Sequence, residues 1–155
     1  MDARGSAPGD TPGDIGALCL VVGEAVAAAI EGRLAGEGFD GARRAPLAVL
    51  DGIAAGDRTV TALALRLGVS TQAASKTVAE LVRAGWVLRH ADPDDRRARV
   101  LVPSARGAEL AAAARRARQA VARDLTRWLG TRDAGELARL LSTAAERYGE
   151  ATLRA

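Results

Sequence analysis

The sequence is poor in the residue types on which most enzymes and secreted proteins depend. Among 155 residues it holds one cysteine, one histidine and four aromatic residues. A single cysteine excludes an internal disulfide and fits a reducing cytoplasm. One histidine and one cysteine, without a glycine-rich phosphate loop, leave no nucleophile–base pair. We therefore expect a cytoplasmic protein that is not an enzyme and that holds no metal ion or other cofactor.

Long apolar runs are also missing. No uncharged stretch approaches the roughly 20 residues that a membrane span requires. Residues 1–13 are rich in Gly, Pro and Asp, and no apolar region follows their positive charge, so we expect a disordered tail and not a signal peptide. Residues 14–155 are then long enough for one domain. With so few aromatic residues, its core is left to Ala, Leu and Val, which favours close-packed helices.

Positive charge is concentrated in the middle of the chain. The net charge is +3, but residues 41–106 alone hold eleven Arg and Lys against six Asp and Glu, a balance of +5. The flanking residues carry a balance of −2. A basic centre between neutral or acidic flanks is typical of a polyanion-binding module, although an Arg-rich chain can also produce it by chance.

Hydrophobic spacing predicts helices on both sides of this basic centre. An amphipathic helix is expected over residues 14–36, a second over 44–55, a long one over 105–129 and a last one over 132–149. The apolar positions that support the first helix are Ile15, Leu18, Cys19, Val22, Val26, Ala29 and Ile30. Those of the long helix are Leu110, Ala114, Ala117, Val121, Leu125 and Trp128.

Residues 59–85 have the pattern of a helix-turn-helix. Thr59 is placed to cap one short helix, Gly68 to end it in the left-handed conformation, and Ser70 to cap the next. Val69 is expected as a buried plug in the turn. The second helix should bury three residues and end near Gly85; these are Ala74, Val78 and Leu81.

Two strands follow, near residues 86–88 and 100–102, and Ser104 is placed to cap the long helix. Between the strands lies HADPDDRRARVLV, which starts at His90 and holds three aspartates and three arginines. As a solvated turn, these charges would only balance one another. As the tip of a hairpin that contacts DNA, an arginine would enter the minor groove, where the negative potential is strongest.

A helix-turn-helix followed by a hairpin is a winged helix, and residues 49–107 resemble the MarR family of bacterial transcriptional regulators. The resemblance rests on LALRLGVSTQAASKTVAELVRAGWV and on the wing signature Asp-Pro-x-Asp-x-Arg at Asp92, Pro93, Asp95 and Arg97. Pro103 departs from the family pattern, which alters only how the second strand joins the next helix. The resemblance implies a mainly α fold, with a winged helix at about 42–104 and dimerisation helices at 14–36 and 105–155. It also implies a homodimer on a pseudo-palindromic operator, and a small aromatic or phenolic effector.

The candidate DNA-binding residues come from two segments. On the second helix of the helix-turn-helix, the residues expected to face DNA are Ser70, Thr71, Gln72, Ser75, Lys76 and Arg83. Gln can pair bidentately with adenine, and Lys can reach guanine or a phosphate. On the wing, Asp95 is expected to orient the two guanidinium groups of Arg96 and Arg97. A merely solvated helix face is the competing interpretation.

Three alternatives remain open. Cys19 lies among the apolar positions of the first helix. It is interpreted either as a small core residue or as a peroxide-sensing thiol, as in some MarR regulators. His90 has no histidine or cysteine near it in sequence with which to bind a metal ion. A winged helix can also bind DNA without sequence preference, or bind a protein partner.

Overall fold

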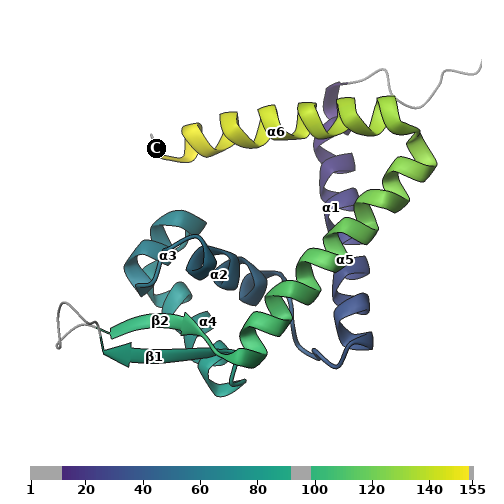
Figure 1. Ribbon diagram of the computed structural model, residues 1–155. Coiled ribbons are helices and arrows are strands. Elements are labelled where there is room, and N and C mark those ends of the chain that lie inside the picture. Colours follow the sequence, from purple (N-terminus) through teal and green to yellow (C-terminus); the bar gives the residue numbers. More distant parts are fainter. Residues whose placement is uncertain (1–11, 92–98, 154–155) are drawn as a thin grey trace, which may run out of the picture.

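The computed structural model describes residues 12–91 and 99–153, and these residues are mainly helical. Helices carry the chain into and out of a small lobe that holds one β-hairpin (Figure 1). The elements are α1 (Pro12–Gly36), α2 (Arg44–Ala54), α3 (Val60–Leu67), α4 (Thr71–Arg83), β1 (Val87–Ala91), β2 (Arg99–Pro103), α5 (Ala105–Leu129) and α6 (Thr131–Leu153). The predicted fold class, a mainly α winged helix with flanking long helices, is confirmed.

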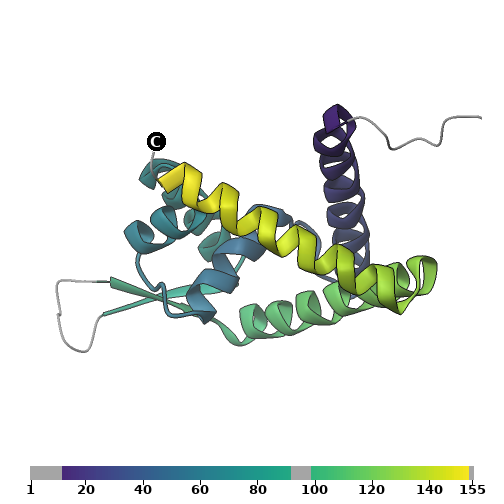
Figure 2. The same cartoon turned by 90° about the horizontal axis from the view of Figure 1, so that it is seen from above.

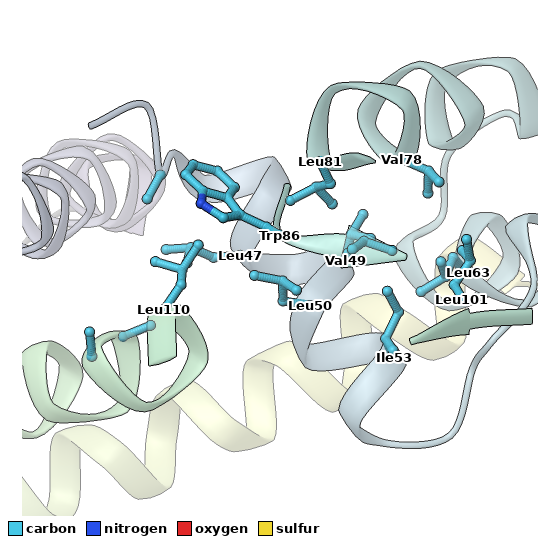
Figure 3. Packing of buried hydrophobic residues seen from close by; sticks show 14 of the residues in the cluster. Leu47, Val49, Leu50, Ile53, Leu63, Val78, Leu81, Trp86, Leu101 and Leu110 are labelled. Atoms are coloured by element: carbon cyan, nitrogen blue, oxygen red, sulfur yellow. The ribbon is translucent and has the colours of Figure 1, made fainter. Parts of the chain in front are cut away.

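The lobe is built from α2, α3, α4 and the hairpin, and its core is aliphatic apart from one tryptophan (Figure 3). Leu50, Leu63, Leu81 and Trp86 are buried there. β1 and β2 pair antiparallel with Leu88 opposite Val102. On its other edge β2 is held by the segment before α3, because the Leu101 N–H donates to the Arg58 carbonyl at 2.8 Å.

The helix ends lie where the capping residues predict them. The hydroxyl oxygen of Thr59 accepts from the Ala62 N–H at 3.1 Å, and that of Ser70 accepts from the Ala73 N–H at 3.1 Å. Between them Gly68 has a φ of 63°, in the left-handed region that favours glycine. These three residues hold α3 and α4 in the helix-turn-helix arrangement, and the predicted caps and left-handed glycine are confirmed.

A tight junction connects the lobe to α5. The Ser104 hydroxyl donates to the Gly85 carbonyl at 2.6 Å and accepts from the Gly107 N–H at 2.9 Å. A Cβ at position 107 would collide with the backbone carbonyl oxygen of Trp86, so only glycine fits there. The first turn of α5 is therefore pressed directly against the chain that leaves α4.

Beyond this junction α5 runs away from the lobe, and α1 packs across it (Figure 1). The Arg33 guanidinium donates to the Asp124 carboxylate at 2.7 Å and connects the two helices. After α5 the chain turns at Gly130 into α6. Figure 2 shows the first half of α1 projecting away from the rest of the chain.

The structure corrects four predictions from the sequence. Val69 is not a buried plug, because 45% of it is exposed. The first helix is not amphipathic, since Leu20 and Val21 lie on its other sides and are as exposed as Leu18. The last helix runs from Thr131 to Leu153 and is longer than the predicted 132–149. The stripe on α5 is buried only through Val121, whereas Trp128 is 73% exposed.

The two ends of the chain expose an unusual amount of apolar surface. The exposed large apolar residues on α1, the end of α5 and α6 are Ile15, Leu18, Leu20, Val21, Val22, Trp128, Leu129, Leu140, Leu141 and Tyr148. By length and composition alone, Asp14–Gly36 of α1 passes as a candidate membrane span, with a mean hydropathy of 1.8. The core helix of a soluble protein passes the same test when it is buried. A helix that is apolar on all sides requires apolar surroundings on all sides.

Candidate nucleic-acid interface

The exposed face of α4 carries the predicted DNA-binding residues. Gln72, Lys76 and Arg83 are all exposed, opposite the buried Val78 and Leu81. Their spacing of four and seven residues brings them onto one face of a helix with 3.6 residues per turn. This face therefore carries polar and basic side chains along most of its length, and it is available to a partner.

The first turn of α4 presents short polar side chains. Thr71 and Ser75 are exposed beside Gln72. The hydroxyl of Ser70 caps the helix, so this side chain already has a structural role, and its predicted contact with DNA stays a prediction. The N-terminal end of α4 carries a partial positive charge from its backbone N–H groups, which adds to the attraction for an anion.

Sequence reasoning did not include Arg89 of β1 among the candidates. Arg89 lies two residues after the buried Val87, so it projects from the same face of the strand. Together with Lys76, Ala79, Val82 and Arg83 it lines a hollow of about 390 Å³ between α4 and β1. Strand alternation places Arg89 on the same face as Val87, but no sequence signal shows that this face lies against α4.

The structure describes the strands of the predicted wing but not the residues at its tip. Asp92, Pro93, Asp95, Arg96 and Arg97 lie outside the described residues, so their predicted roles stay predictions. The two strands that lead to them are present, with Ala91 paired to Arg99 at the outer end of the ladder. A hairpin therefore stands beside α4, as a wing requires.

A second concave site lies between the lobe and the long helices. Its volume is about 400 Å³, and it is lined by α1, α2 and the middle of α5. Arg118 of α5 reaches across it to donate to the Asp51 carboxylate of α2 at 2.8 Å. The lining residues are Gly23, Val26, Ala27, Ile30, Glu31, Arg44, Leu47, Ala48, Asp51 and Arg118.

Cys19 and His90 are both exposed in the protomer. The interpretation of Cys19 as a core residue is therefore wrong for the single chain, and a redox role stays a prediction. Within the described ranges, no group of three or more His, Cys, Asp or Glu side chains lies together in a way that could hold a metal ion.

The fold and the exposed basic helix define a winged helix-turn-helix protein. Residues 41–98 match the model of the MarR family. No sequence among the curated proteins matches the chain. The predicted resemblance to the MarR family is confirmed over this segment, and the whole chain has the fold of MarR-type transcriptional regulators.

Solved structures extend the likeness to the flanking helices. A MarR protein from Peptoclostridium difficile superposes with a TM-score of 0.75 at 16% identity, covering 97% of this chain and 99% of its own. CouR from Rhodococcus jostii, bound to p-coumaroyl-CoA, gives 0.66 at 24% identity, with 85% and 92% covered. Wild-type apo MarR from E. coli gives 0.65 at 23% identity, with 84% and 96% covered.

Proposed function

We propose that this protein is a sequence-specific DNA-binding transcriptional regulator that acts as a homodimer on a pseudo-palindromic operator and responds to a small ligand as a repressor. The observation that carries the proposal is the exposed polar face of α4, which is capped, rigidly held and flanked by a hairpin. A recognition helix places its N-terminal residues against base edges in the major groove. Thr71, Gln72 and Ser75 occupy that part of α4.

Replacing Gln72 tests whether α4 reads sequence. Gln72→Ala is expected to reduce the ratio of affinities for specific and random duplex, because a bidentate contact to a base discriminates by about 1–3 kcal/mol. The fold should not change, since Gln72 is exposed. Fluorescence anisotropy with both duplexes measures the ratio. An unchanged ratio would show that Gln72 does not read a base, and a wild-type protein that binds both duplexes equally would favour a winged helix without sequence preference.

A homodimer is proposed because the protomer leaves the apolar surface of α1, α5 and α6 uncovered. Large exposed apolar surfaces usually mark an interface. The hollow between α5 and α6, of about 350 Å³, is lined by small residues and by Leu125, Leu137 and Leu141, so it offers an apolar surface to another helix. A two-fold dimer formed there would present two α4 helices, as a palindromic operator requires. It would also surround the apolar α1, so this helix needs no membrane, in keeping with a cytoplasmic location.

Ligand control is proposed for the cleft between α1, α2 and α5. The cleft is apolar at Val26, Ile30 and Leu47 and charged at Arg118 and Asp51. It lies between the long helices and the lobe, so a ligand that binds there can shift one relative to the other. CouR, which shares the fold, is described as bound to p-coumaroyl-CoA. A small aromatic or phenolic molecule with an acidic group suits this combination.

Salicylate is expected to raise the melting temperature and to weaken binding to the specific duplex. Its carboxylate would compete with Asp51 for Arg118, and coupling between two sites is typically about 1–3 kcal/mol. Thermal shift and anisotropy measure the two effects. The matched variant Arg118→Gln should lose both. If a panel of aromatic acids left the melting temperature and the affinity unchanged, the cleft would not be an effector site for this class of ligand.

A further inference from the structure

The hollow between α4 and β1 brings three cations together without an acid. Its charged lining residues are Lys76, Arg83 and Arg89, and its floor is Ala79 and Val82. In the part of the chain that the structure describes, none of the three cations takes part in an ion pair. Converging like charges repel one another, so an anion bound between them would relieve this repulsion.

Three other arginines of the protein take part in ion pairs within the fold. Arg66 pairs with Asp57 at 2.9 Å, Arg118 with Asp51 at 2.8 Å, and Arg33 with Asp124 at 2.7 Å. These pairs join neighbouring elements of the fold. The cations of the α4–β1 hollow also come from two elements, but they are exposed to solvent and, among the residues that the structure describes, do not pair with an acid across the hollow.

The position of the hollow identifies the anion. When a helix occupies a major groove and the hairpin beside it contacts the adjacent minor groove, one sugar–phosphate backbone separates the two grooves. That backbone must pass between the helix and the hairpin. Ala79 is small and Val82 is partly buried, so neither side chain blocks the approach of the DNA backbone to the hollow.

We infer that Lys76, Arg83 and Arg89 form a seat for the phosphates of this backbone segment. The inference rests on the proposed DNA-binding function and divides α4 into two parts. Thr71, Gln72 and Ser75 at its start read bases, whereas Lys76 and Arg83 fix the register of the protein on the duplex. Arg89 completes the seat from the strand side and is assigned as a positioning residue. Phosphate contacts position a protein, and base contacts specify the sequence.

The test compares full-length variants on two probes, a duplex enriched from a random library by the wild-type protein and a duplex of random sequence. Arg89→Ala and Lys76→Ala should each lower the slope of log affinity against log salt by about one unit. Each should weaken binding to both probes by the same factor, so their ratio stays constant. Arg89→Lys should restore the slope, because a phosphate requires only a charge, whereas a bidentate base contact requires the guanidinium. Arg115→Ala, an exposed arginine on α5, is the matched control.

A second measurement locates the contact on the DNA. Neutral methylphosphonate groups replace one phosphate at a time in the enriched duplex. Arg89→Ala should be insensitive to the replacement at one or two neighbouring positions where the wild type loses affinity. Unchanged salt slopes in both alanine variants, or a loss of preference at a single base pair, would overturn the phosphate seat. If no sequence is enriched, the proposed specificity fails, and the slopes on random duplex still decide whether the seat exists.

Discussion

A protein shortened by residues 132–155 is expected to be monomeric and to bind its specific duplex at least about 100-fold more weakly than the full chain. Two linked recognition helices bind with an avidity that exceeds that of either alone by about 10² to 10⁴. Removing α6 takes away one side of the α5–α6 hollow and the exposed Leu140 and Leu141. Light scattering and anisotropy measure the two effects.

A point variant separates loss of the dimer from loss of the fold. Leu140 and Leu141 are 51% and 46% exposed in the protomer, so Leu140→Glu with Leu141→Glu should leave the isolated protomer folded. In a dimer interface the two buried charges would be strongly unfavourable. The double variant should therefore be a folded monomer with weak DNA binding. A wild-type protein that is monomeric and fully folded at micromolar concentration would contradict the proposed dimer.

Gly107→Ala is expected to destabilise the protein by at least about 3 kcal/mol. Overpacking a core typically costs about 1–3 kcal/mol when side chains can move, and here the obstacle is the backbone carbonyl of Trp86. The added methyl group would force the start of α5 away from the strand and would strain the hydrogen bonds of Ser104. Because α5 links the lobe to the long helices, DNA binding should weaken as well.

Gly32→Ala provides the matched control. Gly32 also lies in a helix, but an added Cβ there meets nothing within 4 Å. Alanine is favoured over glycine in a helix by about 1 kcal/mol, so this variant should be as stable as the wild type or more so. Thermal unfolding followed by circular dichroism compares the two. Equal stability of both alanine variants would show that the junction at Trp86 is not tight.

The winged helix was largely predictable because its signals are local. Thr59, Gly68, Ser70 and Ser104 cap or end helices through backbone groups three or four residues away, and each lies where the sequence placed it. The further hydrogen bond from Ser104 to the Gly85 carbonyl was not predicted. The buried face of α4 also followed from helical spacing. Val69 was misplaced because the burial of a turn residue depends on what packs over it, which no local pattern records.

The long helices were harder to interpret. The apolar residues of α1 were assigned to one face, although Leu20 and Val21 lie on others, because a helix that is apolar on several sides shows no clear periodicity. Arg89 and the cleft at Arg118 depend on which elements meet in space. The sequence predicts a strand at β1 and helices at α2 and α5, but it does not predict which of these elements lie close together in the fold. The helix face of α4 was predictable, whereas its partner across the hollow was not.

Selection of bound duplexes from a random library by the purified full-length protein decides whether the protein reads DNA sequence. We expect enrichment of an inverted repeat whose half-sites are about one helical turn of DNA apart, since two α4 helices related by a two-fold axis must enter successive major grooves. Gln72→Ala should lose the preferred base at matching positions of both half-sites. A library that remains random after repeated rounds, with binding that depends only on salt, would contradict sequence-specific regulation.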